Sequence, residues 1–199
     1  MLNLLRHKFI AGFTTIEILA AAAIVSGGYA GYGNALAKAK NKAVEIQCTS
    51  NLKQVAQALQ MYEMMEGRLP NAKFFPKEPR KDPRSLLKIL GPQYAKFLVC
   101  PSMPEKLQKR GLTFLWNDKY SGKPLSSVPK PTKTWLMIEM SAAFPEVPPP
   151  HRGGFLVLYA DMHVAWTNEI PKELIVKKES GEGSQQPKEN RDPQGPSKR

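Results

Sequence analysis

The most regular hydrophobic pattern in the chain lies in residues 34–66. Apolar residues recur there at spacings of three and four, which places them on one face of an α-helix: Val44, Cys48, Leu52, Val55, Leu59 and Tyr62. Lysine, glutamate and glutamine side chains occupy the opposite face. Gly67 follows as a C-terminal cap and Pro70 as a stop, so the pattern predicts an amphipathic helix that ends near Glu66.

An almost uncharged segment, residues 13–33, precedes this amphipathic pattern. Its single charged side chain is Glu17, and as a helix the segment is long enough to cross a hydrocarbon layer of about 30 Å. Arg6 and Lys8 lie before it. This positive charge predicts that residues 1–12 stay in the cytoplasm and that the body of the protein lies on the other side of the membrane. A secretory signal peptide, removed together with its apolar run, is an alternative.

The remainder of the chain divides into a folding segment, residues 67–176, and a polar end, residues 177–199. The pattern of apolar residues in the folding segment predicts a short helix at 84–90 and short strands at 97–99, 112–116, 134–139, 155–159 and 163–166. A tight turn at 160–162 joins the last two strands. The polar end is rich in Gly, Ser, Gln, Pro and Lys and holds no large apolar residue. We therefore expect an α+β domain followed by a disordered basic tail.

Positive charge is concentrated in one part of the chain. Residues 68–133 hold 15 Lys and Arg against 4 Asp and Glu, a net +11 of the total +12. Such a concentration indicates either a soluble, self-repelling surface or an acidic partner such as nucleic acid, lipid headgroups or polysaccharide. Aromatic residues are not interleaved with the basic ones as in a nucleic-acid groove, which favours the first interpretation.

Cys48 and Cys100 are the only cysteines. The chain has no C-x-x-C pair, which argues against a zinc site built on cysteines. In a domain outside the cytoplasm the two can form a disulfide, closing a loop of about 53 residues. Two separate buried thiols are the alternative, and the sequence leaves both open.

Three residues near the C-terminal hairpin carry further candidate chemistry. His151, Asp161 and His163 can be read as metal ligands, but their spacing matches no established metal motif. The favoured interpretation is that His151 and Asp161 form a hydrogen bond across the hairpin and fix the fold. Neither a nucleophile–base pair nor a phosphate loop is evident, so the sequence predicts no enzyme, no cofactor and no metal.

The segment Gly12-Phe13-Thr14-Thr15-Ile16-Glu17 resembles the type IV pilin and pseudopilin superfamily. The resemblance implies a long N-terminal helix packed on a small antiparallel sheet. It also implies cleavage between Gly12 and Phe13 by a prepilin peptidase and N-methylation of Phe13. In this family the carboxylate at the position of Glu17 pairs with the N-terminal amine of a neighbouring subunit during assembly. A lone carboxylate at membrane depth is costly, which agrees with the need for such a partner.

A second resemblance covers the body of the chain. The run from Cys48 to Gln54, the helix exit from Gly67 to Pro70, and His151 followed by nine residues and Asp161 are similar to prepilin-like proteins with a C-terminal His-x9-Asp-Gly signature. Met162 replaces the turn glycine, which puts the type of turn in doubt.

These resemblances imply a structural subunit of a type II secretion or type IV pilus-like filament. Its expected partners are the prepilin peptidase, other pilin or pseudopilin subunits and the inner membrane. Two alternatives remain. One is a DNA-binding minor pilin of an uptake machine, and the other is a membrane-anchored metal-binding protein or enzyme that uses His151, Asp161 and His163.

Overall fold

The structure, a computed structural model, describes the backbone of residues 15–179 and the side chains of residues 34–175. Its internal contacts divide the chain into two units, one up to Ala43 and one from Val44 onward. The predicted leader, residues 1–12, and nearly all of the predicted tail lie outside the described residues. What can be described in detail is therefore the second unit and the last turns of helix before it.

Helix α1 is the longest element and spans Thr15–Glu66, 52 residues. From Val44 onward its apolar face is buried, and Cys48, Leu52 and Val55 are fully inaccessible to solvent. The helix ends where the sequence predicted, because Gly67 adopts φ of 67°. In this left-handed conformation the Gly67 N–H donates to the carbonyl of Glu63 at 2.8 Å.

The described side chains of α1 before Val44 differ in exposure from those after it. Every side chain in residues 34–43 is exposed. In the part of the chain that the structure describes, no helix combines the length and the apolar character needed to span a membrane. The predicted membrane segment, residues 13–33, lies outside the residues whose side chains are described.

The second unit contains a four-stranded antiparallel sheet in the order β1-β2-β3-β4. The strands lie close to the predicted positions: β1 Phe114–Trp116, β2 Trp135–Glu139, β3 Phe155–Tyr159 and β4 Val164–Thr167. Every residue of β1 and β2 is buried, whereas β4 is partly exposed. The unit is therefore α+β, as the sequence predicted.

Short helices connect these elements, and two of them correct the sequence-based prediction. The short helices are α2 Leu86–Ile89, α3 Glu105–Gln108, α4 Lys172–Glu179 and the 3₁₀ helices η1 Pro92–Leu98, η2 Asp118–Tyr120, η3 Leu125–Ser127 and η4 Met140–Ala142. The two that correct the prediction are η1 and α4. The predicted strand at 97–99 is wrong, since its first two residues belong to η1. The tail predicted from residue 177 is wrong for its first three residues, because α4 runs to Glu179. Leu174, 2% exposed, anchors the first turn of α4 in the core.

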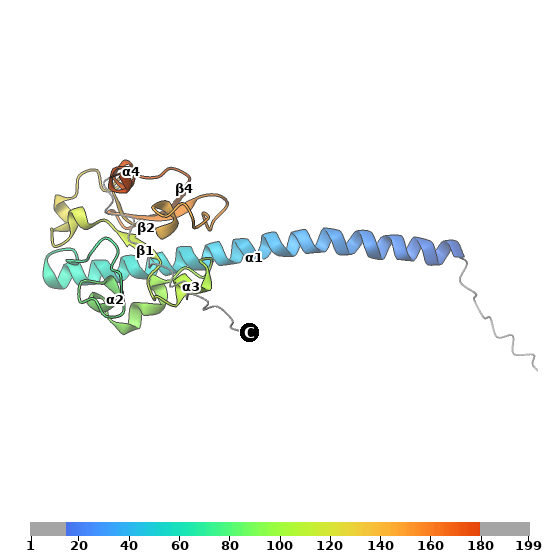
Figure 1. Cartoon of the computed structure of the whole chain (residues 1–199), viewed down its shortest axis with the longest axis horizontal. Helices are drawn as coiled ribbons and strands as arrows, with labels where there is room; N and C mark the ends of the chain where they lie inside the picture. The colour runs from blue at the N-terminus through green and yellow to red at the C-terminus, as the bar shows by residue number, and fades with distance from the viewer. Residues whose placement is uncertain (1–14, 180–199) are drawn as a thin grey trace, which may run out of the picture. The chain divides into compact units, whose positions relative to one another are not determined.

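The core of the second unit joins α1 to the sheet and to the loops around it. Trp116, Phe114 and Leu52 are among its largest fully buried side chains and come from β1 and α1. In Figure 1, β4 and α4 are drawn above this part of α1, and α2 and α3 below it. A single hydrophobic cluster therefore fixes the relative positions of the elements that carry the site described next.

Candidate functional site

A disulfide bond joins Cys48 of α1 to Cys100, which lies between η1 and α3. The Cα atoms are 5.3 Å apart, and both residues are fully buried. Of the two alternatives left open by the sequence, the structure has the disulfide. Closing a loop with a sequence separation of 52 residues removes entropy from the unfolded chain and stabilises the fold by about 4 kcal/mol.

Two further hydrogen bonds hold the segment around Cys100 in place. The Cys100 N–H donates to the Thr113 hydroxyl at 2.8 Å. The side-chain amide of Asn51, on α1, donates to the carbonyl of Val99 at 3.0 Å. The backbone at Val99 and Cys100 is therefore held by Thr113 on one side and by α1 on the other.

Beside the disulfide lies a buried acid–base pair, Glu139 and His151. Glu139 ends β2, and its Oε1 is 2.9 Å from Nε2 of His151. Its second oxygen, Oε2, accepts a hydrogen bond from the Leu156 N–H at 2.9 Å. Burial raises the pKa of the Glu139 carboxyl, although the hydrogen bond from His151 acts in the opposite direction. The pair is thus a satisfied polar interaction inside an apolar core.

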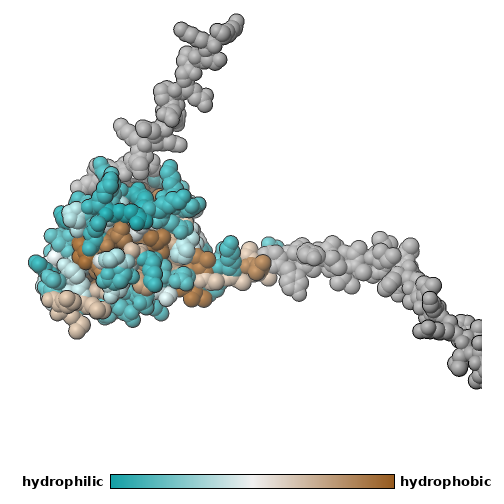
Figure 2. Space-filling view, turned by 90° about the horizontal axis from the view of Figure 1, so that it is seen from below, coloured by the Kyte–Doolittle hydropathy of each residue, from teal (hydrophilic) through white to brown (hydrophobic). Residues whose placement is uncertain are grey.

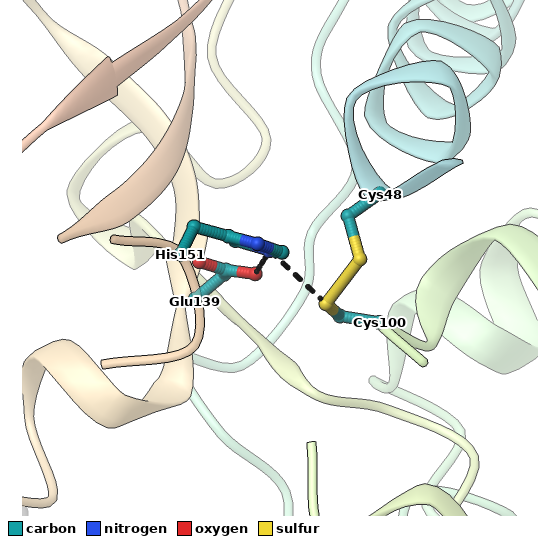
Figure 3. Close-up of side chains that lie close together, drawn as sticks. All are labelled: Cys48, Cys100, Glu139 and His151. Atoms are coloured by element: carbon teal, nitrogen blue, oxygen red, sulfur yellow. Dashed lines mark hydrogen bonds and ion pairs between the residues drawn. A yellow bond between two sulfur atoms is a disulfide. The ribbon is translucent and has the colours of Figure 1, made fainter. Parts of the chain in front are cut away.

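The disulfide and the acid–base pair form one cluster (Figure 3). The Nε2 atom of His151 is also 3.4 Å from Sγ of Cys100, so one ring nitrogen contacts both the carboxylate and the sulfur. One donor atom from each of Cys48, Cys100, Glu139 and His151 lies within 4.8 Å of the other three. These are residue types that bind transition metals, and all four are buried.

An outer layer of contacts holds the backbone around His151 and connects it to α1. The indole N–H of Trp166 donates to the carbonyl of His151 at 2.7 Å. The next residue, Arg152, donates from Nε and Nη2 to the two carboxylate oxygens of Glu45, each at 2.8 Å. Its guanidinium also lies 5.3 Å from the centre of the Trp166 ring. Glu45 is on α1, so this bidentate pair is a second link between the helix and the hairpin.

The predicted hydrogen bond between His151 and Asp161 is wrong. His151 precedes β3 and Asp161 follows it, and the five residues of the strand separate them by roughly 17 Å. Asp161 instead pairs with Nδ1 of His163 and accepts from its backbone N–H at 3.2 Å. Burial alone would raise the pKa of Asp161, but these hydrogen bonds from His163 outweigh it and lower the pKa.

The same geometry corrects the alternative metal site at the hairpin. Asp161 and His163 lie on the surface at the turn, whereas His151 is 2% exposed and belongs to the cysteine cluster. Met162, between the first two, has φ of 69°. The hairpin therefore turns through a left-handed residue even without glycine, at a cost of about 1–2 kcal/mol.

The remaining predicted site residues fall where the structure gives no side-chain positions. Gly12 and Phe13, the predicted cleavage and methylation site, lie outside the described residues. The backbone of Glu17 is part of α1, but its side chain lies outside the described side chains. Cleavage, methylation and assembly through these residues therefore stay predictions.

Sequence reasoning did not find Glu139 as the partner of His151. The one available signal was a carboxylate directly after a run of buried strand residues, Trp135–Ile138. No protein-family model, curated protein or solved structure matches this chain. Its function has to be inferred from its own residues.

Proposed function

We propose that this chain is a structural subunit of a type IV pilin-like filament, a pseudopilin-class prepilin of a type II secretion or type IV pilus machine. Helix α1 is the observation that carries the proposal. It begins inside the pilin-like motif Gly12–Glu17 and continues as one helix to Glu66. From Val44 onward its apolar face is buried in the α+β domain, whereas residues 34–43 are exposed. A long helix on a small antiparallel sheet is also the arrangement expected of the type IV pilin fold.

The length and exposure of α1 support assembly through the helix. A helix of 52 residues is about 78 Å long, well beyond what packing on this small domain requires. Residues 34–43 are all exposed, and Leu36 retains 73% of its accessible surface. The apolar segment 13–33 precedes them. The corresponding helices of neighbouring subunits would cover this apolar segment and bury it from water and lipid.

The joint between helix and domain also suits a filament subunit. A subunit held in a filament by its helix must pass mechanical load from that helix to the domain. Within the second unit, three links connect residues 44–66 of α1 to the rest of the domain: the Cys48–Cys100 disulfide, the Glu45–Arg152 pair and the hydrogen bond from Asn51. Because one is covalent and another is a bidentate charge pair, the joint resists separation better than apolar packing alone.

The proposal is tested first by the chemistry of the N-terminus. The full chain is co-expressed with a prepilin peptidase and recovered from membranes for mass spectrometry. We expect a mature protein that begins with N-methylated Phe13. A Gly12→Val variant should remain uncut. The control, Ala11→Val, introduces the same side chain one position earlier and should still be processed. A mature chain that begins after Ala23 or Gly28 would instead show ordinary secretion and overturn the proposal.

The surface charge favours one second candidate, a subunit that also binds nucleic acid. Of the 15 basic residues in 68–133, all but Arg110 are exposed. The face seen from below in Figure 2 carries hydrophilic side chains around an apolar patch. A gel-shift titration of the full chain with double-stranded DNA tests this candidate. We expect an affinity that falls steeply as salt is raised if phosphates are bound, and no salt-dependent shift if the charge serves solubility alone.

A further inference from the structure

The buried cluster offers metal-binding chemistry that the proposed filament function does not use. Cys48 comes from α1, Cys100 from the loop after η1, Glu139 from the end of β2 and His151 from the bridge before β3. Their exposed fractions are 0%, 0%, 0% and 2%. Four donor atoms of sulfur, oxygen and nitrogen thus meet at one buried point, drawn from four separate parts of the fold (Figure 3).

We propose that these four side chains bind one zinc ion once the Cys48–Cys100 disulfide is reduced. A dithiol reductant supplies two electrons to the sulfur–sulfur bond and is itself oxidised to a disulfide. The two cysteine thiols then lose their protons to solvent as the metal binds, because thiolate is the ligand form. The product is a closed site with two sulfur, one nitrogen and one oxygen ligand, the four-coordinate arrangement typical of structural zinc.

The distances in the cluster are close to those that zinc requires. Bonds of about 2.0–2.3 Å in a tetrahedron place neighbouring ligand atoms roughly 3.3–3.8 Å apart. His151 Nε2 is 3.4 Å from Sγ of Cys100 and 2.9 Å from Oε1 of Glu139. All four donors lie within 4.8 Å of one another. Once the covalent bond between the sulfurs is broken, shifts on the order of 1 Å complete the site.

The groups around the cluster act as the outer shell that such a site needs. The Leu156 N–H holds one oxygen of Glu139 and leaves the other directed at His151. The Trp166 indole fixes the backbone of His151 through its carbonyl. Partners of this kind keep ligands in position and contribute strongly to metal affinity.

Charge gives a reason for the cluster to take a divalent cation when it is reduced. Two thiolates and a carboxylate at one buried point would repel each other and be poorly solvated. A zinc ion would offset two of these three negative charges. Binding should therefore release protons and tighten as pH rises.

The consequence for the fold is that α1 stays cross-linked in both redox states. In the oxidised state the covalent bond connects Cys48 to the loop before β1. In the reduced state the metal connects the same two residues and adds Glu139 and His151 to the link. This inference does not depend on filament assembly, because the cluster lies within the second unit.

The test compares oxidised and reduced forms of the same full chain, purified in detergent micelles without a histidine tag. Each form is incubated with zinc, desalted and analysed for bound metal. We expect about one zinc per reduced chain and less than a tenth of that for the oxidised chain. Cobalt should give a sulfur-to-metal charge-transfer band with the reduced chain alone. A reduced chain that retains no zinc overturns the proposal.

Variants identify the ligands. His151→Asn and Glu139→Gln should weaken zinc binding by the reduced chain, by about a hundredfold or more for a lost ligand, since loss of an outer-shell partner alone costs 10–100-fold. Asp161→Asn and His163→Asn, the matched pair at the hairpin surface, should bind zinc as the original chain does. Circular dichroism of each oxidised variant checks folding independently of the metal. Unchanged zinc uptake by a Cys48→Ser/Cys100→Ser chain would overturn the proposal.

Discussion

At the scale of single residues, Glu139 is the polar group on which the core depends most. Its carboxylate faces the imidazole of His151 and the backbone N–H of Leu156, and its exposed fraction is 0%. Removing it leaves two buried donors without an acceptor. We expect Glu139→Ala to lower the free energy of unfolding by about 3–5 kcal/mol, the range for deleting one partner of a buried pair.

The conservative variant separates charge from shape. Glu139→Gln keeps one acceptor oxygen for the two donors, so we expect a smaller loss of about 1–3 kcal/mol. Chemical denaturation of the oxidised chain with a chelator present measures both. Asp161→Ala is the control, because it deletes an exposed carboxylate that also pairs with a histidine and should cost less than about 1 kcal/mol. Equal losses for Glu139→Ala and Asp161→Ala would contradict this account of the core.

Asp82 gives a pH-dependent prediction with a definite sign. It accepts from Lys73 Nζ at 2.7 Å and from the Arg84 N–H at 2.9 Å. The hydrogen bond from Lys73, followed by that from Arg84, lowers the pKa of Asp82. A lowered carboxylate pKa adds stability above the unfolded value near pH 4, and this stability is lost as pH falls through the folded pKa.

The measurement is the stability difference between the original chain and Asp82→Asn as a function of pH. Because the pair lies near the surface, we expect a difference below about 1 kcal/mol at pH 7. It should shrink steadily as the solution is acidified below about pH 4. Lys77→Met, a nearby exposed lysine removed in the same loop, should show no such trend. A constant difference across the acid range would rule out the ionised Asp82 as its source.

The candidate site shows why residue-level chemistry was harder to predict than helix and strand positions. Cys48, Cys100, Glu139 and His151 are far apart in the sequence and follow no spacing rule. A metal-ligand motif is recognisable when one local element presents several ligands, whereas here each ligand comes from a different element. The two histidines near the hairpin look equivalent in the sequence. In the structure, β3 lies between them in the chain, so that His151 is buried before the strand and His163 is exposed after it.

At the scale of elements, the parts that the sequence predicted are those with strong periodicity. The buried stripe of α1 and the runs at β2 and β3 carry enough apolar residues to decide their structure locally. Phe97 and Leu98 formed a short apolar run without alternation, and Pro92 at the start of η1 favoured a helical turn instead. Helix α4 was missed because its sequence is mostly charged. Among the residues of α4 whose side chains the structure describes, 172–175, Leu174 is the buried one.

Replacing Gly153 and Gly154 in turn by alanine tests how closely the chain at the start of β3 packs against β4. A Cβ atom at Gly154 would lie 2.5 Å from the Thr167 carbonyl oxygen and 2.7 Å from the Trp166 ring, so β4 would have to move. At Gly153 a Cβ meets nothing within 4 Å, but φ is 77°. We expect Gly154→Ala to cost about 1–3 kcal/mol or more through steric conflict, and Gly153→Ala about 1–2 kcal/mol through backbone strain.

Two readouts distinguish these causes. Thermal denaturation gives the stability of each variant, and the tryptophan fluorescence of the chain, to which Trp166 contributes together with Trp116 and Trp135, reports on the surroundings of the indole. Gly154→Ala should change the fluorescence, because the new methyl group contacts the indole, whereas Gly153→Ala should leave it unchanged. If Gly154→Ala is the milder variant and leaves the fluorescence unaltered, the close approach of the two strands is wrong.

At the scale of the whole molecule, the proposed filament places Glu17 among the apolar residues of 13–33. A lone carboxylate at membrane depth costs about 2.5–3.5 kcal/mol or more to insert. Cleavage after Gly12 would free an amine on Phe13, and in the assembled filament this amine of one subunit would meet Glu17 of the next. Two buried opposite charges are tolerated where they pair. Glu17 would therefore oppose membrane insertion and favour assembly.

These opposite effects give the prediction that tests assembly. Glu17→Ala should leave the subunit anchored in the membrane as well as before, because the apolar segment loses its charge. It should suppress filament formation, since each subunit then carries an unpaired buried ammonium, a loss of commonly about 3–5 kcal/mol. Glu17→Gln keeps the size and a hydrogen-bonding group but not the charge, and should also assemble poorly. Filaments are recovered by shearing or cross-linking from cells with matched expression. Normal yields from both variants would show that Glu17 takes no part in assembly, and the proposed use of α1 would lose its charged contact.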